Sequence, residues 1–404
     1  MARNRSLGSV TRYPPPREDW RVRWYDDTGH QRETSAPTEA QGRRIVLERM
    51  GKPAPSPTAR MAWGEMAQEA LDTLPSAVTG RKGGVTDSTR YGYRSILANH
   101  AASTEVWNMP AGKVTEVHLQ AVVDRVMARG LTARTARTTG QVLRSIYTQA
   151  IRNKRVVTNP MDLVELPPLG RSTIQPLSLE ETQDLLAHLE ANQDRHLALY
   201  YLATGTGMRI GECLALRWAD LTLEGPKPRV QVHATLVRGD YQPHTKTPHG
   251  TRPIPLITNV REALLRHRRE VWGPERMAAG ADWARGAEFE DYVFTRVPRY
   301  AGHAGRPGHA STYNRHLRAA LAASGIEERR LARLVAAGVR APERLRWHDL
   351  RHGFATHTLE NGVPMVEVSR WLGHASERIT SDIYYTWTEV AQDRMVSTLE
   401  AIGY

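Results

Sequence analysis

Cysteine is almost absent from this 404-residue chain, which has only one, Cys213. A single cysteine excludes an intrachain disulfide and a cysteine-based metal cluster, and it fits a reducing cytoplasm. Apolar runs of about 18 residues are also lacking, so we expect no membrane span. The basic start of the chain has no apolar core behind it, so we expect no signal peptide. No period of roughly 20–50 residues repeats, which argues against a repeat architecture.

The chain has fewer acidic than basic residues. The chain has 55 Lys and Arg against 43 Asp and Glu, a net charge of +12, and residues 1–170 carry three quarters of this excess. Such a balance favours a polyanionic partner, either nucleic acid or an anionic membrane surface, and without a membrane segment we favour nucleic acid. The 40% apolar and 24% charged residues are typical of a globular protein, and the length predicts two or three domains.

Residues 1–56 are predicted to form a small sheet-plus-helix unit. Residues 20–25 alternate Trp-Arg-Val-Arg-Trp-Tyr, the pattern of a half-buried strand, and residues 31–35 follow a turn as the returning strand. Thr38 and Gln41 form a capping box that opens a helix to about residue 50. The side chains on the open sheet face suit insertion into a DNA groove, although a solvated face is the alternative. They are Arg21, Arg23 and Tyr25.

A Pro-rich linker at residues 52–57 precedes a helical segment, residues 57–168. Its apolar periodicity and end signals predict four helices. They lie near residues 61–74, 86–102, 115–129 and 132–153. Four arginines on the last helix fall within about 80° of arc, so they could follow a phosphate backbone, and a solvated face explains them equally well. They are Arg134, Arg137, Arg144 and Arg152.

Residues 169–404 are predicted to be mostly helical with one β insertion. Ser178 and Glu181 form a second capping box. Residues 229–237 alternate like a strand, and residues 251–256 are the candidate partner strand. The Gly- and Pro-rich stretch 274–310 is predicted to be loop. The expected fold class is therefore mainly α with small β elements, that is, α+β.

Four motifs in this third segment bring together residues that suit phosphate chemistry. In Thr204-Gly-Thr-Gly-Met-Arg-Ile-Gly-Glu, glycines precede Arg209, which opens a short apolar helix and can direct its guanidinium at an anion. Lys246 lies in the turn region between the two predicted strands. In His348-Asp-Leu-Arg-His, His348 and Arg351 share one helix face. The fourth motif is Trp-Leu-Gly-His374, followed by Tyr384 and Tyr385.

Two other interpretations of these motifs fail. The glycine-rich motif lacks the Gly-Lys-Ser/Thr ending of a nucleotide P-loop. His348 and His352 have the spacing of a zinc peptidase pair, but Asp349 replaces the usual glutamate, and an arginine inside the pair disfavours a cation.

In their order along the chain, these motifs resemble the catalytic domain of the tyrosine recombinases, specifically the phage and mobile-element integrases. The resemblance rests on Thr-Gly-x-Arg-x-x-Glu, a lysine in a β-turn, His-x-Leu-Arg-His, Leu-Gly-His and then Tyr. It implies an arm-type DNA-binding domain at residues 1–56, a helical core-binding domain at 57–168, and a mixed α/β catalytic domain with a C-terminal tail at 169–404. The implied catalytic set is Arg209, Lys246, His348, Arg351, His374 and Tyr384.

The resemblance implies two successive phosphoryl transfers on DNA between two attachment sites. Tyr384 would attack the scissile phosphate and form a 3′-phosphotyrosyl enzyme. Arg209 and Arg351 would neutralise the transition state, so no metal, ATP or other cofactor is expected. Lys246 would act as general acid and His348 as general base or phosphate donor. His374 would hydrogen-bond the phosphate, and Glu212 is expected to brace Arg209.

The same resemblance implies partners and leaves alternatives open. It implies double-stranded DNA attachment sites, a homotetramer on DNA in the cytoplasm of a bacterial host, and exchange of the C-terminal tail between neighbours. Whether a DNA-bending protein or a directionality factor is needed stays open. Thr386 stands where many members have a histidine, and Tyr385 is the alternative nucleophile. The alternative functions are a type IB topoisomerase-like enzyme and an inactive DNA-binding relative.

Overall fold

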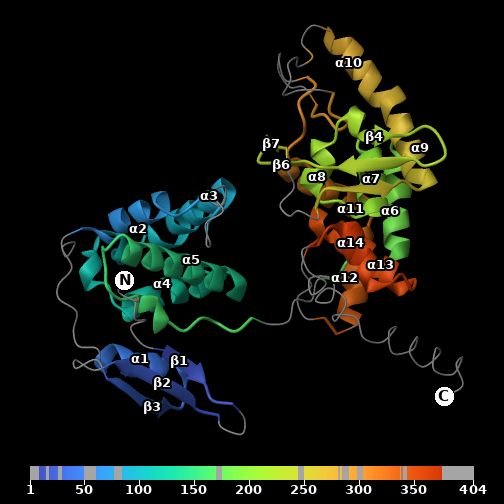
Figure 1. Cartoon of the computed structure of the whole chain (residues 1–404). Coiled ribbons are helices and arrows are strands. Elements are labelled where there is room, and N and C mark those ends of the chain that lie inside the picture. Colours follow the sequence, from blue (N-terminus) through green and yellow to red (C-terminus); the bar gives the residue numbers. More distant parts are fainter. Residues whose placement is uncertain are drawn as a thin grey trace, which may run out of the picture. The chain divides into compact units, whose positions relative to one another are not determined.

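The structure, a computed structural model, describes most of the chain. It covers residues 9–14, 18–25, 30–49, 61–76, 84–169, 175–243, 250–280, 283, 291–297, 304–336, 338–339 and 344–374. The chain divides into two compact units, Met1–Gly170 and Arg171–Tyr404. Helices predominate over small sheets in both, which confirms the predicted fold class (Figure 1). Within the described ranges, no helix combines the length and apolar character needed to cross a bilayer.

The first unit begins with a three-stranded antiparallel sheet in the order β1-β2-β3, with helix α1 on one face (Figure 1). Its elements are β1 Ser9–Arg12, β2 Trp20–Tyr25, β3 Gln31–Ala36 and α1 Glu39–Arg49. Val22 is fully buried beneath α1, and a Cβ at Gly42 would lie 2.9 Å from the side chains of Val10 and Val22. Glycine therefore lets α1 approach the sheet closely. Both predicted strands and the Thr38 cap are confirmed, the latter by a 3.2 Å bond from the Gln41 amide.

The rest of the first unit is a bundle of four main helices, at the positions predicted from periodicity. They are α2 Trp63–Asp72, α3 Asp87–Ile96, α4 Glu116–Ala128 and α5 Ala133–Arg152. Short π and 3₁₀ turns supplement them at Leu97–Ala101, Glu105–Asn108, Ala111–Lys113 and Pro160–Asp162. Two large buried side chains meet in the core, where the Trp63 indole donates a 2.9 Å hydrogen bond to the Tyr147 hydroxyl. This bond satisfies polar atoms that burial would otherwise leave unpaired.

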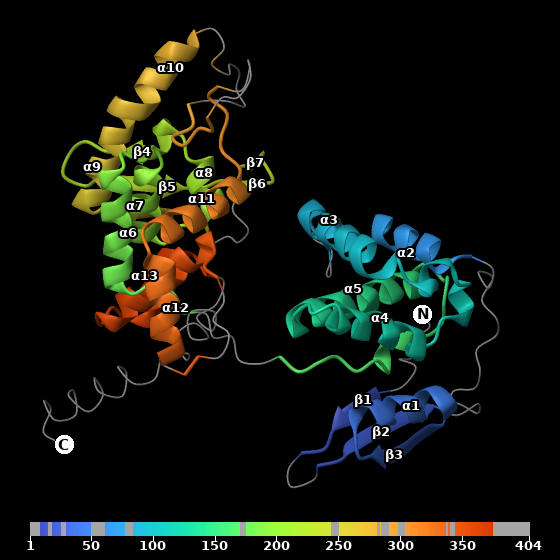
Figure 2. The same cartoon turned by 180° about the vertical axis from the view of Figure 1, so that it is seen from behind.

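The second unit is built around α7, which is apolar on all sides and largely buried. Its helices are α6 Leu179–Ala191, α7 Leu197–Thr206, α8 Ile210–Ala215, α9 Thr258–His267, α10 Gly273–Ala279, α11 Ala310–Ala323, α12 Ile326–Ala336, α13 Trp347–Glu360 and α14 Met365–Leu372. Short turns lie at Trp218–Asp220 and Arg268–Trp272. Helix α10 extends from one end of the unit, and α12 and α13 lie toward the other (Figures 1 and 2). The Ser178–Glu181 capping box is confirmed, with bonds of 2.8 and 3.1 Å.

The β insertion of the second unit differs from its prediction in one respect. The elements are β4 Leu221–Thr222, β5 Arg229–Val232, β6 Thr235–Val237, β7 Asp240–Gln242 and β8 Arg252–Pro255. β5 pairs with β8 as predicted, Val230 opposite Ile254, in an antiparallel sheet ordered β4-β5-β8. The predicted single strand 229–237 is wrong, because the chain leaves this sheet after Val232 and β6 pairs with β7 in a separate hairpin. The loop predicted at 274–310 begins instead with most of α10.

Candidate active site

Gly207 positions Arg209 at the start of α8. Helix α7 ends at Thr206, and Gly207 takes a left-handed conformation with φ of +65°. A Cβ at Gly207 would lie 2.6 Å from side-chain atoms of both Leu372 and Phe354. Only glycine fits both the conformation and the space. The chain reverses there, and Arg209 follows in extended conformation as the N-cap of α8.

Glu212 is a buried carboxylate shared by two arginines. Its side chain is 3% exposed. Oε1 accepts a 2.8 Å bond from Arg209 Nη1, and Oε2 accepts bonds from the Arg209 amide at 3.1 Å and from Arg252 Nη2 at 3.2 Å. Burial alone would raise the pKa of Glu212, but the charges of Arg252, Arg209 and Arg351 outweigh burial and hold its pKa below the usual value. Glu212 is therefore ionised and braces Arg209, the contact expected from the sequence.

Arg252 is a buried residue of this cluster that the sequence analysis missed. It opens β8, and besides Glu212 it donates from Nε to the Trp371 carbonyl at 2.5 Å and from Nη1 to the Gly250 carbonyl at 2.7 Å. The sequence held one signal: along β8, Arg252 alternates with the prolines and lies on the same buried face as Ile254. A charged residue at an inward position of a strand needs a buried partner.

Arg351 joins the two glycine-terminated helix ends of the site. It projects from α13 and is 3% exposed. Its Nη1 donates to the Gly207 carbonyl at 2.8 Å and its Nη2 to the Leu372 carbonyl at 2.7 Å. Burial first, and then the neighbouring charge of Arg209, lower its pKa to about 9. It therefore remains charged at neutral pH, so Arg209 and Arg351 supply two fixed positive charges to one place.

Two histidines accompany these arginines and are neutral at pH 7. His374 follows the left-handed Gly373 at the end of α14 and is 9% exposed. Burial, followed by the charges of Arg351 and Arg209, lowers its pKa to about 3. His348, in the first turn of α13, is open to solvent on one side. The protein packed around it, then His352 and Arg351, lower its pKa to about 4. Neutral imidazoles can donate or accept a hydrogen bond beside the fixed charges.

The low pKa of His374 predicts a loss of stability in mild acid. An unfolded histidine takes up its proton near pH 6.5, whereas folded His374 resists protonation down to about pH 3. The unfolded chain thus binds more protons as the pH falls below 6.5, and His374 contributes a loss of at most about 1.4 kcal/mol per pH unit. We expect His374→Gln to flatten the fall in Tm between pH 7 and pH 5. His188→Gln on α6 serves as the control, and an unchanged pH dependence in His374→Gln would contradict this prediction.

The structure thus brings four of the six predicted catalytic residues into one cluster. Arg209, His348, Arg351 and His374 meet where α8, α13 and the end of α14 converge, and electrostatic coupling links all four. Lys246, Tyr384 and the alternative Tyr385 lie outside the described residues. The cluster has a chemical character of its own: it presents charged and neutral hydrogen-bond donors, which suits an anion such as a phosphate.

Two of the three predicted DNA-binding residues of the sheet lie beside an acidic side chain. Arg23 Nε donates a 2.6 Å bond to Glu33, and Arg21 Nε lies 3.2 Å from the same carboxylate. The Arg21 guanidinium also lies over the Tyr13 ring. Tyr25 is the last residue of β2. Arg21 and Arg23 thus lie on the face of β2 opposite buried Val22, as the alternation predicts, and Glu33 offsets part of their charge.

The four predicted DNA-binding arginines of α5 differ in their surroundings: two bond to backbone carbonyls and two are exposed. Arg144 donates a 2.6 Å bond to the Met161 carbonyl, and Arg137 donates a 3.1 Å bond to the Pro167 carbonyl. These two bonds hold the chain that returns along α5. Arg134 and Arg152 are exposed. The two exposed members are therefore the better candidates for a phosphate backbone.

One group of side chains in the second unit has the composition of a metal site. The ligand atoms of Asp194, His196 and His316 lie within 4.8 Å of one another. However, both ring nitrogens of His316 already form hydrogen bonds. Nδ1 is bonded to the Tyr200 hydroxyl at 2.8 Å, and Nε2 is bonded to the Asp194 carboxylate at 2.9 Å. A metal ion would have to displace a hydrogen bond of His316. We interpret the group as a polar network that joins α7 to α11.

Comparison with known proteins shows which family the chain resembles. Residues 175–389, more than half of the sequence, match the Phage integrase family. A tyrosine recombinase XerC-like protein of Caldanaerobacter subterraneus subsp. tengcongensis is 25% identical over 327 residues, which cover 77% of this chain and 76% of that protein. An integrase of Streptomyces ambofaciens is 27% identical over 369 residues, which cover 86% of each.

Solved structures share the fold. The Tn1549 transposon integrase in complex with transposon right end DNA has a TM-score of 0.61 at 19% identity, covering 85% of this chain and 100% of that chain. A lambda integrase tetramer bound to a Holliday junction has a TM-score of 0.55 at 16% identity, covering 92% and 93%. The family match decides the assignment: this chain belongs to the phage integrase family, and it is an enzyme of the tyrosine site-specific recombinase class.

Proposed function

We propose that this protein cuts and rejoins DNA strands between two attachment sites through a 3′-phosphotyrosyl intermediate. One observation carries the proposal: the Arg209 and Arg351 guanidinium groups lie next to the buried Glu212 carboxylate, and two neutral imidazoles accompany these arginines. Phosphoryl transfer adds negative charge to the non-bridging oxygens of the phosphate. Donors that are already in place stabilise that charge without reorganising.

The chemistry follows in two balanced steps. The Tyr384 oxygen attacks the scissile phosphorus while the bond from phosphorus to the 5′-oxygen breaks, and His348 accepts the tyrosine proton. Lys246 protonates the leaving 5′-oxygen. A 5′-hydroxyl from the partner strand then attacks the phosphotyrosine and gives its proton to the neutral Lys246 amine. The bond from phosphorus to the Tyr384 oxygen breaks, and His348 returns the proton to that oxygen. Each step exchanges one phosphoester for another, so strand joining needs no ATP.

Arg209, Arg351 and His374 hold the phosphate in this scheme. The two arginines supply the positive charge that a divalent metal ion supplies in many phosphoryl-transfer enzymes, so we propose that the reaction is independent of metal. Glu212 and Arg252 act as positioning residues, because they contact Arg209 and the end of α14 rather than the phosphate.

We assign DNA contacts to both units. The sheet-plus-helix region, residues 1–56, would bind arm-type sites, and the helices of residues 57–168 would bind the core site. Residues 169–404 would carry out catalysis. The proposed active assembly is a homotetramer on two duplexes in the bacterial cytoplasm, by analogy with the lambda integrase tetramer bound to a Holliday junction. A DNA-bending protein or a directionality factor would be additional partners.

Trapping of a covalent protein–DNA adduct tests the proposal. The substrates are duplexes nicked beside candidate attachment-site cores, so that the released fragment diffuses away and rejoining fails. We expect the parent protein and Tyr385→Phe to form the adduct in EDTA, and Tyr384→Phe to form none, because phenylalanine has no nucleophilic oxygen. Loss only in Tyr385→Phe would move the nucleophile by one residue. A requirement for added Mg²⁺ would overturn metal independence, and an adduct with both variants would overturn the mechanism.

A further inference from the structure

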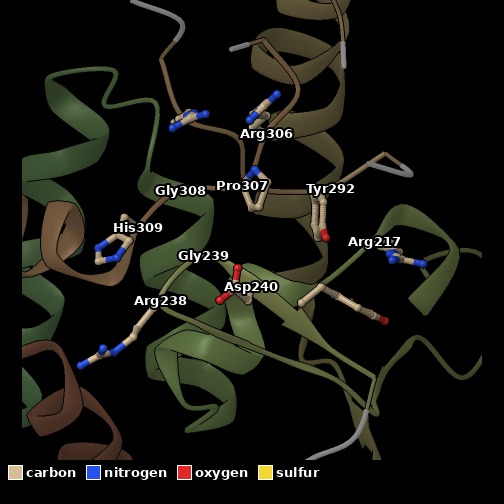
Figure 3. Close-up of a pocket in the computed structure, with 11 residues that line it drawn as sticks. Arg217, Arg238, Gly239, Asp240, Tyr292, Arg306, Pro307, Gly308 and His309 are labelled. Atoms are coloured by element: carbon tan, nitrogen blue, oxygen red, sulfur yellow. The ribbon is translucent and has the colours of Figure 1, made fainter. Parts of the chain in front are cut away.

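A strongly basic pocket in the second unit lies outside the catalytic cluster. Its volume is about 770 Å³, and the described residues that line it include four arginines and one acidic residue, Asp240. The arginines are Arg217, Arg238, Arg296 and Arg306. Figure 3 shows three of them, Arg217, Arg238 and Arg306, on three sides of the cavity with Asp240 between them. Of the proposed catalytic residues that the structure describes, Arg209, His348, Arg351 and His374, none lines this pocket.

The walls of the pocket come from separate parts of the chain that are tied together through their backbones. The Val293 amide donates to the Leu216 carbonyl at 2.9 Å, and the Trp218 amide donates to the Asp291 carbonyl at 3.1 Å. These bonds flank Arg217. On the other wall, the Arg296 amide donates to the Arg306 carbonyl at 3.0 Å. The arginines therefore project from segments that hydrogen bonds already hold in place. This lowers the conformational entropy that the backbone would lose when a ligand binds.

The side chains of the pocket offer more hydrogen-bond donors than acceptors. Among the described residues, Arg296 Nε is buried and has no hydrogen-bond partner. A guanidinium N–H that reaches neither water nor an acceptor is unfavourable, so a rotation of Arg296 that turns Nε toward an anion in the pocket would be favoured. The Arg217 guanidinium lies 4.2 Å from the centre of the Tyr241 ring. The centres of the Tyr241 and Tyr292 rings are 6.4 Å apart. The two rings add flat apolar surface next to the positive charge.

We propose that this pocket binds a phosphate ester, with the attached sugar or base against the tyrosines. Guanidinium groups match phosphate oxygens with paired N–H donors, and the excess of arginine over Asp240 supplies the charge. Two sources share this chemistry: a backbone phosphate of bound DNA, away from the scissile one, and a free nucleotide. The DNA source rests on the proposed function, whereas the nucleotide source does not.

The first arm of the test measures DNA binding by the full-length protein. We would titrate a fluorescent duplex of about 30 base pairs and arbitrary sequence at several salt concentrations between roughly 50 and 200 mM. If the pocket holds a DNA phosphate, Arg296→Gln/Arg306→Gln lowers the slope of log K against log salt by about one, because one phosphate contact is lost. Arg296→Lys/Arg306→Lys keeps the charge and the slope. Arg269→Gln removes the same charge from an arginine that is 71% exposed, and serves as the control.

The second arm titrates AMP into the same proteins in a calorimeter. The nucleotide source is supported if the parent binds AMP, the glutamine double variant binds it at least tenfold more weakly, and the salt dependence of DNA binding is unchanged. An altered slope without AMP binding supports the DNA source. An unaltered slope together with AMP binding that is absent or equal in both proteins would overturn the pocket proposal, provided that the melting curves show a folded variant. Neither arm requires strand cleavage, so the Tyr384 adduct reports separately on the proposed function.

Discussion

Replacing Arg351 by lysine is expected to slow strand cleavage about a thousandfold, the typical effect of losing one pre-positioned donor in a transition state. The Arg351 guanidinium donates to the Gly207 and Leu372 carbonyls through two different nitrogens, and its charge is coupled to that of Arg209. A lysine ammonium is a single point and cannot hold both carbonyls and also present a planar fork to phosphate. Single-turnover cleavage of the nicked duplex measures the effect directly.

A matched control separates this loss from a general effect of lysine. Arg329, on α12, is 59% exposed and pairs with Asp184 at the surface. Arg329→Lys should therefore cleave at the parent rate. If Arg351→Lys retained cleavage within a few-fold of the parent while the control behaved normally, Arg351 would not be the transition-state donor, and Arg209 alone would have to supply the charge.

Replacing Glu212 by glutamine is expected to destabilise the second unit by about 3 kcal/mol, because it leaves buried arginine charge uncompensated. The Arg252 side chain is only 8% exposed and pairs with the Glu212 carboxylate at 3.2 Å, so its charge cannot turn to water. For a unit of this size we expect Tm to fall by roughly 6–12 °C. Calorimetry would show the shift. Glu328→Gln, at an exposed position of α12, is the control and should leave Tm unchanged.

A double-mutant cycle tests whether Glu212 acts through Arg252. Once Glu212→Gln has removed the carboxylate, Arg252→Met removes a charge that no longer has its partner, so the second substitution should cost much less than it does alone. We expect a coupling free energy of about 1–3 kcal/mol between the two substitutions. Effects that simply add, to within about 0.5 kcal/mol, would show that Arg252 is held by the Trp371 and Gly250 carbonyls and not by Glu212.

Local patterns predicted much of the secondary structure because the forces involved are local. The alternation of residues 20–25 identified β2, and the Thr38 cap and the Ser178 capping box marked the starts of two helices. β1 escaped prediction because its four residues, Ser9–Arg12, form a strand through pairing with β2 rather than through a pattern of their own. The break between β5 and β6 escaped for the same reason: the alternation continues, but the partner strand changes.

The sequence by itself determined the family and four members of the clustered site, because the chemistry demands particular residue types in a recognisable order along the chain. Apart from the brace of Arg209 by Glu212, it did not reveal how those residues are held. Arg252 lies 119 residues from Trp371 and 40 from Glu212, yet it contacts both, and the basic pocket joins walls from several distant segments. Such contacts depend on which elements pack together. The alternation along β8 marks Arg252 as inward-facing, but no local pattern identifies its distant partners. Only the tertiary structure decided them.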